Sequence, residues 1–134
     1  MSEKKITIVS PANGKAVLLE QVPDAVFADK ILGDGMAVIP SDGEFFSPVD
    51  GVIISVADTL HAIGFQADNG LDVLIHIGLD TVKLGGEGFQ VFVKEGDRVK
   101  VGDAVAQVHL RLLADRGLNP ITPIVICDGL DDRE

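Results

Sequence analysis

The sequence has few of the residues that usually anchor a core or cross-link a chain. Its 134 residues include no Trp, no Tyr, six Phe and a single cysteine, Cys127. One cysteine excludes an internal disulfide and favours a reducing compartment. A chain of this length buries roughly two-thirds of its unfolded surface, so it can form a core without a disulfide or a metal. We therefore predict a single domain over residues 1–134 with a mainly aliphatic core.

Basic residues and long apolar runs are also scarce. Lys and Arg number 11 against 21 Asp and Glu, which gives a formal net charge of −10. This charge repels phosphate backbones and anionic lipids, so it argues against nucleic-acid binding and favours a partner with a basic patch. No apolar run has the length of a membrane span or a signal peptide. We expect a cytoplasmic monomer that does not insert into a membrane.

Glycine and proline divide the chain into short segments. Fifteen Gly and six Pro separate runs that are rich in Val and Ile. Short β-branched runs with frequent turn signals are typical of an all-β sandwich or barrel. Residues 23–31 and 110–118 are the stretches that look helical. The predicted strands are 6–9, 17–19, 36–39, 52–56, 71–77, 89–93, 104–108 and 124–127.

Two pairs of similar segments suggest an internal repeat. Ser-Pro-Ala-Asn-Gly at residues 10–14 resembles Ser-Pro-Val-Asp-Gly at 47–51, and Glu-Gly-Asp at 95–97 resembles Val-Gly-Asp at 101–103. Proline fixes φ where a strand begins, and glycine supplies a positive φ in the turn. The second pair resembles the hairpin of barrel-sandwich hybrids, the fold of biotinyl and lipoyl carriers. Duplication and simple reuse of common turns both explain these similarities.

A tight turn at residues 68–70, Asp-Asn-Gly, predicts a hairpin that brings two histidines together. A loop of residues 68–69 places His61 directly opposite His76, and a loop of residues 69–70 makes them diagonal neighbours. Either register puts their Cβ atoms about 5 to 8 Å apart on one face of the sheet. That face also carries Thr59 and Leu74. The opposite face, directed into the core, carries Val73, Ile75 and Ile77.

Two neighbouring imidazoles permit three interpretations. They can be a structural pair with no chemical role. They can bind zinc, but zinc takes three or four protein ligands and two histidines fall short of that number. They can also transfer a phosphoryl group, which needs one neutral nitrogen as nucleophile and a nearby donor for the phosphoryl oxygens. Phosphoryl transfer requires the fewest additional residues.

The run Gly-Leu-Asp-Val-Leu-Ile-His-Ile-Gly-Leu-Asp-Thr-Val at residues 70–82 resembles the active-site signature of a known family. This family comprises the glucose-type IIA components of the bacterial phosphoenolpyruvate-dependent sugar phosphotransferase system. The resemblance implies an antiparallel β-sandwich built from duplicated hybrid motifs. It also implies a phosphocarrier that accepts a phosphoryl group from phospho-HPr and donates it to the IIB domain of a IIB/IIC sugar permease. Further similar segments are 22–27, 33–37, 47–51, 61–62 and 86–89.

The resemblance assigns roles to four residues around the predicted hairpin. His76 takes the position of the phosphoacceptor, which reacts through Nε2. A backbone carbonyl near Gly78 is expected to hold the Nδ1 proton of His76 and so fix its tautomer. His61 takes the position of the second histidine, which stabilises the phosphoryl group, and Thr59 supplies a hydroxyl beside it.

The resemblance also implies a docking surface around these histidines. Asp24 and Asp80 match carboxylates that receive a basic side chain of HPr, although each aspartate can instead cap a helix or turn. An apolar rim is expected to exclude water from the phosphohistidine; its Phe27 can equally belong to the core. The predicted rim residues are Phe27, Ile31, Leu32, Leu74 and Val82.

Two other proteins of the same hybrid-motif architecture are alternatives. A zinc metallopeptidase needs H-x-x-x-D and H-x-H motifs, but residues 61–63 are His-Ala-Ile and residues 76–78 are His-Ile-Gly. A biotinyl or lipoyl carrier needs a lysine at a hairpin tip, commonly between methionines, and neither Met1 nor Met36 has a lysine beside it. Both alternatives therefore lack their functional residues.

The sequence departs from the resembled family at its C-terminal end. The family continues past the strand at residues 124–127 with a further segment that ends in a β-strand, and the given sequence shows no equivalent of it. An exposed sheet edge, a shorter subfamily that closes the sheet differently, and a truncated chain are the three explanations. The missing segment carries the family's third zinc ligand, a glutamate. Zinc binding through His61 and His76 is therefore disfavoured, and no cofactor is expected. His109 matches no functional position and is predicted to lie on the surface, and Cys127 is predicted to be buried and inert.

Overall fold

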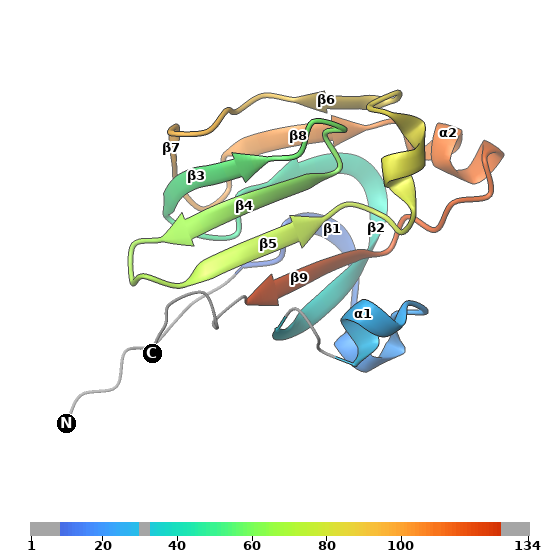
Figure 1. Ribbon diagram of the computed structural model, residues 1–134, viewed down its shortest axis with the longest axis horizontal. Coiled ribbons are helices and arrows are strands. Elements are labelled where there is room, and N and C mark those ends of the chain that lie inside the picture. Colours follow the sequence, from blue (N-terminus) through green and yellow to red (C-terminus); the bar gives the residue numbers. More distant parts are fainter. Residues whose placement is uncertain (1–8, 30–32, 127–134) are drawn as a thin grey trace.

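The computed structural model describes residues 9–29 and 33–126, whose strands all pair in antiparallel fashion (Figure 1). This confirms the predicted all-β fold. Within these ranges, no helix is long and apolar enough to cross a membrane. The helical segments described are η1 (Leu19–Gln21), α1 (Ala25–Ala28), η2 (Thr81–Leu84) and α2 (Leu110–Asp115). The strands described are β1 (Ala12–Leu18), β2 (Asp34–Phe46), β3 (Gly51–Val56), β4 (Ala62–Ala67), β5 (Asp72–His76), β6 (Phe89–Val91), β7 (Arg98–Val99), β8 (Ala104–Val108) and β9 (Thr122–Ile126).

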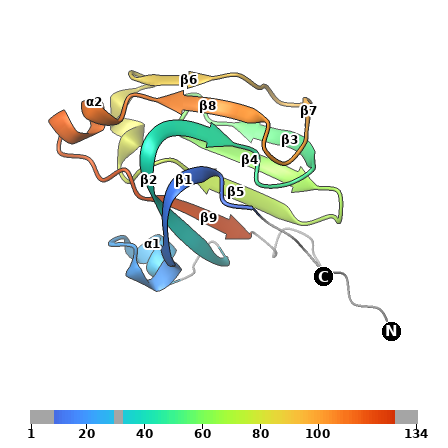
Figure 2. The ribbon, with the colours of Figure 1, turned by 180° about the vertical axis from the view of Figure 1, so that it is seen from behind.

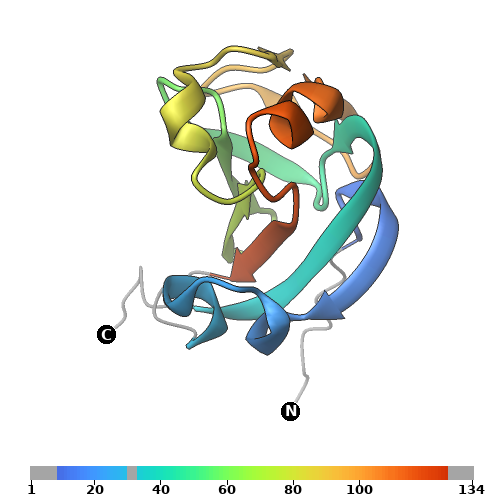
Figure 3. The same ribbon diagram turned by 90° about the vertical axis from the view of Figure 1, so that its right-hand side faces the viewer.

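The sheet curls because its two end strands follow one another in the sequence. The strand order is β6-β8-β2-β9-β5-β4-β3-β7, and β1 pairs with β2 beside this path (Figure 2). Seven steps between strands of a flat sheet cover about 34 Å. The chain from Val91 at the end of β6 to Arg98 at the start of β7 can reach only about 25 Å. The sheet must therefore wrap around a common interior, as Figure 3 shows.

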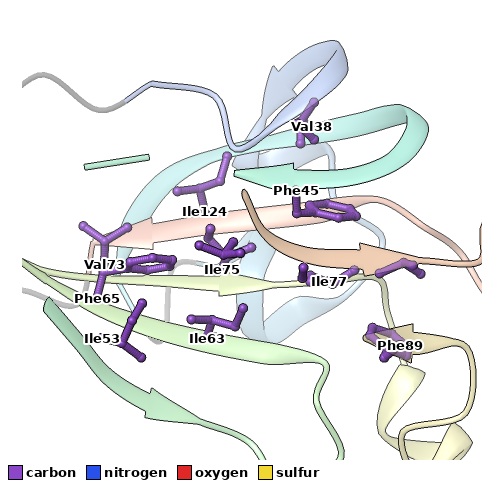
Figure 4. Packing of buried hydrophobic residues seen from close by; sticks show 14 of the residues in the cluster. Val38, Phe45, Ile53, Ile63, Phe65, Val73, Ile75, Ile77, Phe89 and Ile124 are labelled. Atoms are coloured by element: carbon purple, nitrogen blue, oxygen red, sulfur yellow. The ribbon is translucent and has the colours of Figure 1, made fainter. Parts of the chain in front are cut away.

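Aliphatic and phenylalanine side chains from nearly every strand fill this interior (Figure 4). Val73 and Ile75 of β5 lie opposite Phe65 and Ile63 of β4, and all four are buried. With Ile77, also buried, they confirm the core positions predicted for this hairpin. A second, smaller cluster joins α1 to the turn that follows β5, next to the end of the strand that carries His76. Its members are Leu19, Val22, Phe27, Ala37, Leu79, Ile121 and Val125.

The two pairs of similar segments adopt the same local structures. The hydroxyls of Ser10 and Ser47 each donate to the carbonyl two residues ahead, at 2.7 and 2.6 Å. The carboxylates of Asp97 and Asp103 each accept from the backbone N–H three residues before, both at 2.9 Å. Matching hydrogen bonds at matching positions are what a structural repeat predicts, and they support the duplicated hybrid motif.

The helices and several strand ends differ from the sequence prediction. The helix expected over 23–31 is the single turn α1, and the helix expected over 110–118 ends earlier, because Gly117 adopts a positive φ of 72° and turns the chain. β2 is much longer than the predicted 36–39, since it pairs with β1, β8 and β9 along its length. Residues 6–8 and Cys127 lie outside the described residues.

Candidate functional site

His76 ends β5, and the chain turns immediately after it at Gly78. Gly78 has a φ of 78°, a conformation that glycine adopts without strain. This turn directs the Gly78 carbonyl back toward His76, whose Nδ1 lies 2.7 Å from the carbonyl oxygen. The predicted contact between the His76 ring and the backbone at Gly78 is confirmed.

The Gly78 contact decides the tautomer of His76. A carbonyl oxygen only accepts hydrogen bonds, so Nδ1 must carry the proton and Nε2 of the neutral ring keeps its lone pair. Burial lowers the pKa of His76, while the Gly78 hydrogen bond and the charges of Asp24 and Asp80 act in the opposite direction. Burial has the larger effect, so His76 is a neutral ring with a nucleophilic Nε2 at neutral pH.

His61 lies just before β4 and is held differently. The preceding residue, Leu60, has a φ of 66°, which redirects the chain into the strand. The Nδ1 atom of His61 lies 2.6 Å from the hydroxyl oxygen of Thr59. Its ring is buried, and burial together with the neighbouring His76 lowers the pKa of His61. His61 is therefore also neutral at neutral pH.

The two imidazoles are in contact, as the sequence predicts. Their ring centroids lie 4.8 Å apart and the ring planes meet at 78°, so one ring presents its edge to the other. The backbone links the same two corners, because the N–H of Ile77 donates to the carbonyl of His61 at 2.7 Å. The arrangement places two neutral imidazoles side by side at the end of the β4–β5 hairpin.

Both predicted hairpin registers are wrong, although the predicted contact is right. The loop contains three residues, 68–70, because Gly70 adopts a φ of 95° and Ala67 pairs with Leu71 across the turn. The residue opposite His76 is therefore Ala62. Strict alternation would then turn His61 toward the core. The alternation does not extend to His61, because β4 begins at Ala62 and the positive φ of Leu60 changes the direction of the chain before it.

Of the predicted apolar rim, Phe27 contacts the imidazole of His76. The ring of Phe27 is buried, and its centroid lies 5.0 Å from that of His76. Leu74 shares the outer face of β5 with His76 and is half-buried, and Val82 is 51% exposed. The predicted rim residues Ile31 and Leu32 lie outside the described residues.

Asp24 precedes His76 in the sequence and Asp80 follows it, and both lie close to the site. Both carboxylates act on the pKa of His76, which places them near its ring. Asp80 is exposed, has a φ of 60°, and makes no side-chain capping hydrogen bond to η2, which follows it. The capping interpretation of Asp80 is therefore not supported. Asp24 precedes α1, and its backbone carbonyl accepts from Phe27 and Ala28.

A family model settles the relationship of this chain to known proteins. The model of the phosphoenolpyruvate-dependent sugar phosphotransferase system, EIIA 1, matches residues 6–131. The chain belongs to this family. It is thus a phosphotransferase component of sugar uptake, as the resemblance in its sequence predicts, and neither the metallopeptidase nor the biotinyl or lipoyl carrier is favoured.

Individual known proteins are similar to this chain along most of its length. A PTS system glucose-specific EIIA component of Oceanobacillus iheyensis is 49% identical over 131 residues, which cover 98% of this chain and 79% of that protein. A glucose-specific EIICBA component of Staphylococcus saprophyticus is 45% identical, over 97% of this chain but 19% of that protein. The structure of glucose permease IIA from Mycoplasma capricolum aligns with a TM-score of 0.90 at 36% identity, covering 95% of this chain and 82% of that one.

The described side chains do not complete a zinc site. Among residues 9–29 and 33–126, no group of three or more His, Cys, Asp or Glu side chains is arranged to hold a metal ion. His61 and His76 alone provide fewer ligands than zinc takes. His109, the third histidine of the sequence, is exposed at the start of α2, as predicted. That the protein needs no cofactor remains a prediction.

Sequence reasoning missed two residues that support the His76 turn. Thr81 is fully buried, and its hydroxyl donates to the carbonyl of Ile77 at 2.6 Å. Asn119, far along the chain, accepts a hydrogen bond from the N–H of Leu79 through its backbone carbonyl at 2.9 Å. Thr81 stands between Asp80 and Val82, so no local pattern marks it as a buried residue, and none connects Asn119 to the histidines.

Proposed function

We propose that His76 accepts a phosphoryl group from phospho-HPr on Nε2 and passes it to the cysteine of a IIB domain of a sugar permease. The hydrogen bond between Nδ1 of His76 and the Gly78 carbonyl carries this proposal. It holds the proton on one nitrogen, so the other is a nucleophile at every encounter rather than in a fraction of the molecules.

Phosphoryl acceptance on His76 needs no proton transfer. The Nε2 lone pair attacks phosphorus, the P–N bond of the donor's phosphohistidine breaks, and its electron pair stays on the donor's ring. The His76 ring gains a positive charge because the Nδ1 proton remains in place. The Gly78 carbonyl 2.7 Å away stabilises this charge. In onward transfer a thiolate attacks phosphorus, and Nε2 recovers its electron pair.

His61 is the candidate donor to the phosphoryl oxygens. When Nδ1 of His61 accepts from the Thr59 hydroxyl, at 2.6 Å, the ring proton resides on Nε2 and is available to an incoming oxygen. The ring centroids lie 4.8 Å apart, so a donor on His61 is close to the His76 ring. A hydroxyl can also reverse its hydrogen bond, so His61 can adjust its protonation as charge arrives and leaves.

The surroundings of His76 suit docking of a basic partner and exclusion of water. Phe27 packs against the ring, and Leu74 and Val82 extend the apolar surface from β5 and η2. Covering such a surface with a partner removes the water that hydrolyses phosphohistidine. Asp24 and Asp80 add negative charge near the ring, which favours a carrier whose docking face is positively charged.

Mass spectrometry after incubation with phosphoenolpyruvate, enzyme I and HPr tests this function. We expect the protein to gain one phosphoryl group, and peptide mapping to place it on His76. The matched control is His109→Ala, because His109 is exposed at the start of α2. Among the described residues, no hydrogen bond or ring contact joins His109 to His76, His61 or Thr59. His109→Ala should be phosphorylated normally and His76→Ala not at all. A phosphoryl group on His109 or His61 in the unaltered protein would overturn the assignment.

A further inference from the structure

We propose that Thr81 and Asn119 are positioning residues for His76. Together they hold the peptide between Gly78 and Leu79 so that its carbonyl binds the Nδ1 proton and Nε2 is left as the reactive nitrogen. This inference rests on the proposed role of His76 as phosphoacceptor and extends it to two residues that do not touch the phosphoryl group.

The Gly78–Leu79 peptide is held at both ends. Its carbonyl oxygen accepts from Nδ1 of His76 at 2.7 Å, and its N–H, which belongs to Leu79, donates to the carbonyl of Asn119 at 2.9 Å. In a trans peptide the C=O and N–H point in opposite directions. Fixing the N–H on Asn119 therefore fixes the direction of the carbonyl, and with it the tautomer of His76.

The side chain of Asn119 shapes the loop that presents this carbonyl. Its Oδ1 accepts from the N–H of Ile121 at 2.9 Å, an Asx turn that bends the chain at Pro120. Ile121 is buried in the same cluster as Leu79 and Phe27, so the loop is anchored beside the site. The connection from α2 to β9 thus supports a turn more than thirty residues earlier in the sequence, and Figure 3 shows η2 and α2 at the same end of the sheet.

Thr81 supports the preceding peptide. Its hydroxyl donates to the Ile77 carbonyl at 2.6 Å, and the N–H of Ile77 donates to the carbonyl of His61 at 2.7 Å. The hydroxyl thereby joins the turn after His76 to the corner that carries His61. Thr81 is fully buried, so no water can replace this hydrogen bond when the hydroxyl is removed.

Thr81 and Asn119 also occupy the space where a side chain of residue 78 would lie. A Cβ added to Gly78 would lie 2.6 Å from Cγ2 of Thr81 and 3.1 Å from the Asn119 carbonyl oxygen. Leu113 of α2 closes the third side at 3.4 Å. Thr81, Asn119 and Leu113 therefore form a bracket around Gly78 that leaves no room for a side chain there. The Gly78 hydrogen bond raises the pKa of His76 against burial, so a loosened bracket is expected to lower that pKa further.

Nitrogen-15 NMR of the histidine rings in the unphosphorylated protein tests the proposal. We expect His76 of the unaltered protein to be protonated on Nδ1 alone at neutral pH. Thr81→Val and Asn119→Ala should each give a mixture of tautomers, a lower His76 pKa and phosphoryl acceptance slowed by about fivefold to tenfold, the effect of one lost hydrogen bond. The KM for phospho-HPr should not change, because neither side chain belongs to the proposed docking surface.

Conservative variants and a matched control separate positioning from general stability. Thr81→Ser keeps the hydroxyl and Asn119→Asp keeps the acceptor, so both should restore the Nδ1 tautomer. Ser47→Ala removes another buried hydroxyl that donates to a backbone carbonyl, that of Val49 at 2.6 Å, and should leave the tautomer unchanged.

One outcome overturns the proposal, and another concerns only the proposed function. If Thr81→Val and Asn119→Ala both keep His76 protonated on Nδ1 alone, the bracket does not set the tautomer. If Thr81→Val fails to fold, the tautomer of His76 in Asn119→Ala tests the proposal by itself. Asn119 is exposed, so its replacement is expected to leave the protein folded. If the unaltered protein shows the Nδ1 tautomer but accepts no phosphoryl group, the proposed function is wrong and the positioning result still holds.

Discussion

His76 and His61 are in contact, yet the two corners of the chain that carry them hold Nδ1 with different partners. At the His76 corner the partner is the backbone carbonyl of Gly78 at 2.7 Å. At the His61 corner the partner is the hydroxyl of Thr59 at 2.6 Å. A carbonyl only accepts, whereas a hydroxyl accepts or donates. One imidazole therefore has a fixed tautomer, and the other can exchange its proton between nitrogens.

This difference suits the two histidines to different tasks. A nucleophile benefits from a fixed tautomer, since every molecule then presents the same reactive nitrogen. A group that stabilises phosphoryl oxygens benefits from an adjustable proton, because charge arrives in one transfer and leaves in the next. A zinc site would treat the two rings as equivalent ligands, so experiments that separate them also separate the two interpretations.

The largest expected effect comes from replacing each histidine in turn. His76→Gln should accept no phosphoryl group, because the amide has no nucleophilic nitrogen. His61→Gln keeps a donor and should accept the group, but onward transfer should slow by about a hundredfold to a thousandfold, the effect of losing one preorganised donor. Single-turnover transfer from phospho-HPr and then to the IIB domain measures both steps. Acceptance blocked in His61→Gln and retained in His76→Gln would mean that the two roles are reversed.

A substitution at Gly78 should break the His76 corner alone. Gly78→Ala forces alanine to a φ of 78° and brings its Cβ within 2.6 Å of Thr81, so we expect the free energy of unfolding to fall by about 2 to 4 kcal/mol. Gly70→Ala is the matched control, since Gly70 has a φ of 95° but nothing lies within 4 Å of an added Cβ. It should lose about 1 to 2 kcal/mol, the cost of a left-handed conformation alone. Urea denaturation of both variants measures the difference, and equal losses would show that the contacts around Gly78 are unimportant.

Stability should fall as the pH drops below the ordinary histidine pKa of 6.5. The pKa values of His76 and His61 are lowered in the folded state, so unfolding takes up protons below pH 6.5 and the free energy of unfolding decreases. Each histidine contributes a slope of at most about 1.4 kcal/mol per pH unit. Urea denaturation between about pH 5 and pH 8 measures how the free energy of unfolding depends on pH. The decline should be shallower in His76→Gln, and an unchanged decline would contradict the lowered pKa.

The smallest expected effect concerns the charge around the two corners. Asp80→Asn should lower the association rate with phospho-HPr a few-fold at low salt, because Asp80 is exposed near His76. The difference should shrink at high salt, where exposed charges are screened within a few ångströms. Glu95→Gln, an equally exposed acid in the turn between β6 and β7, is the control. Stopped-flow rates equal for both variants at low salt would contradict a specific role of Asp80 in docking.

The hairpin shows how far sequence reasoning reaches in this protein. The strands on both sides of residues 68–70 and the inward direction of Val73 and Ile75 follow from alternation, and the structure confirms them. The loop length does not follow, because the positive φ of Gly70 adds a third loop residue and shifts the pairing by one. The histidines meet only because Leu60, a non-glycine residue, adopts a positive φ that no propensity predicts.

The sequence by itself determined the interactions that span a few residues. A histidine followed two positions later by glycine can fold its Nδ1 onto the glycine carbonyl, and Thr59 lies within the same short reach of His61. The tertiary structure alone decided how the two corners meet and what holds them. Phe27 arrives from α1 and Asn119 from the loop after α2, and both are separated from His76 by more than forty residues. Such contacts depend on how the whole sheet curls around its core, and local conformational preferences do not encode that curvature.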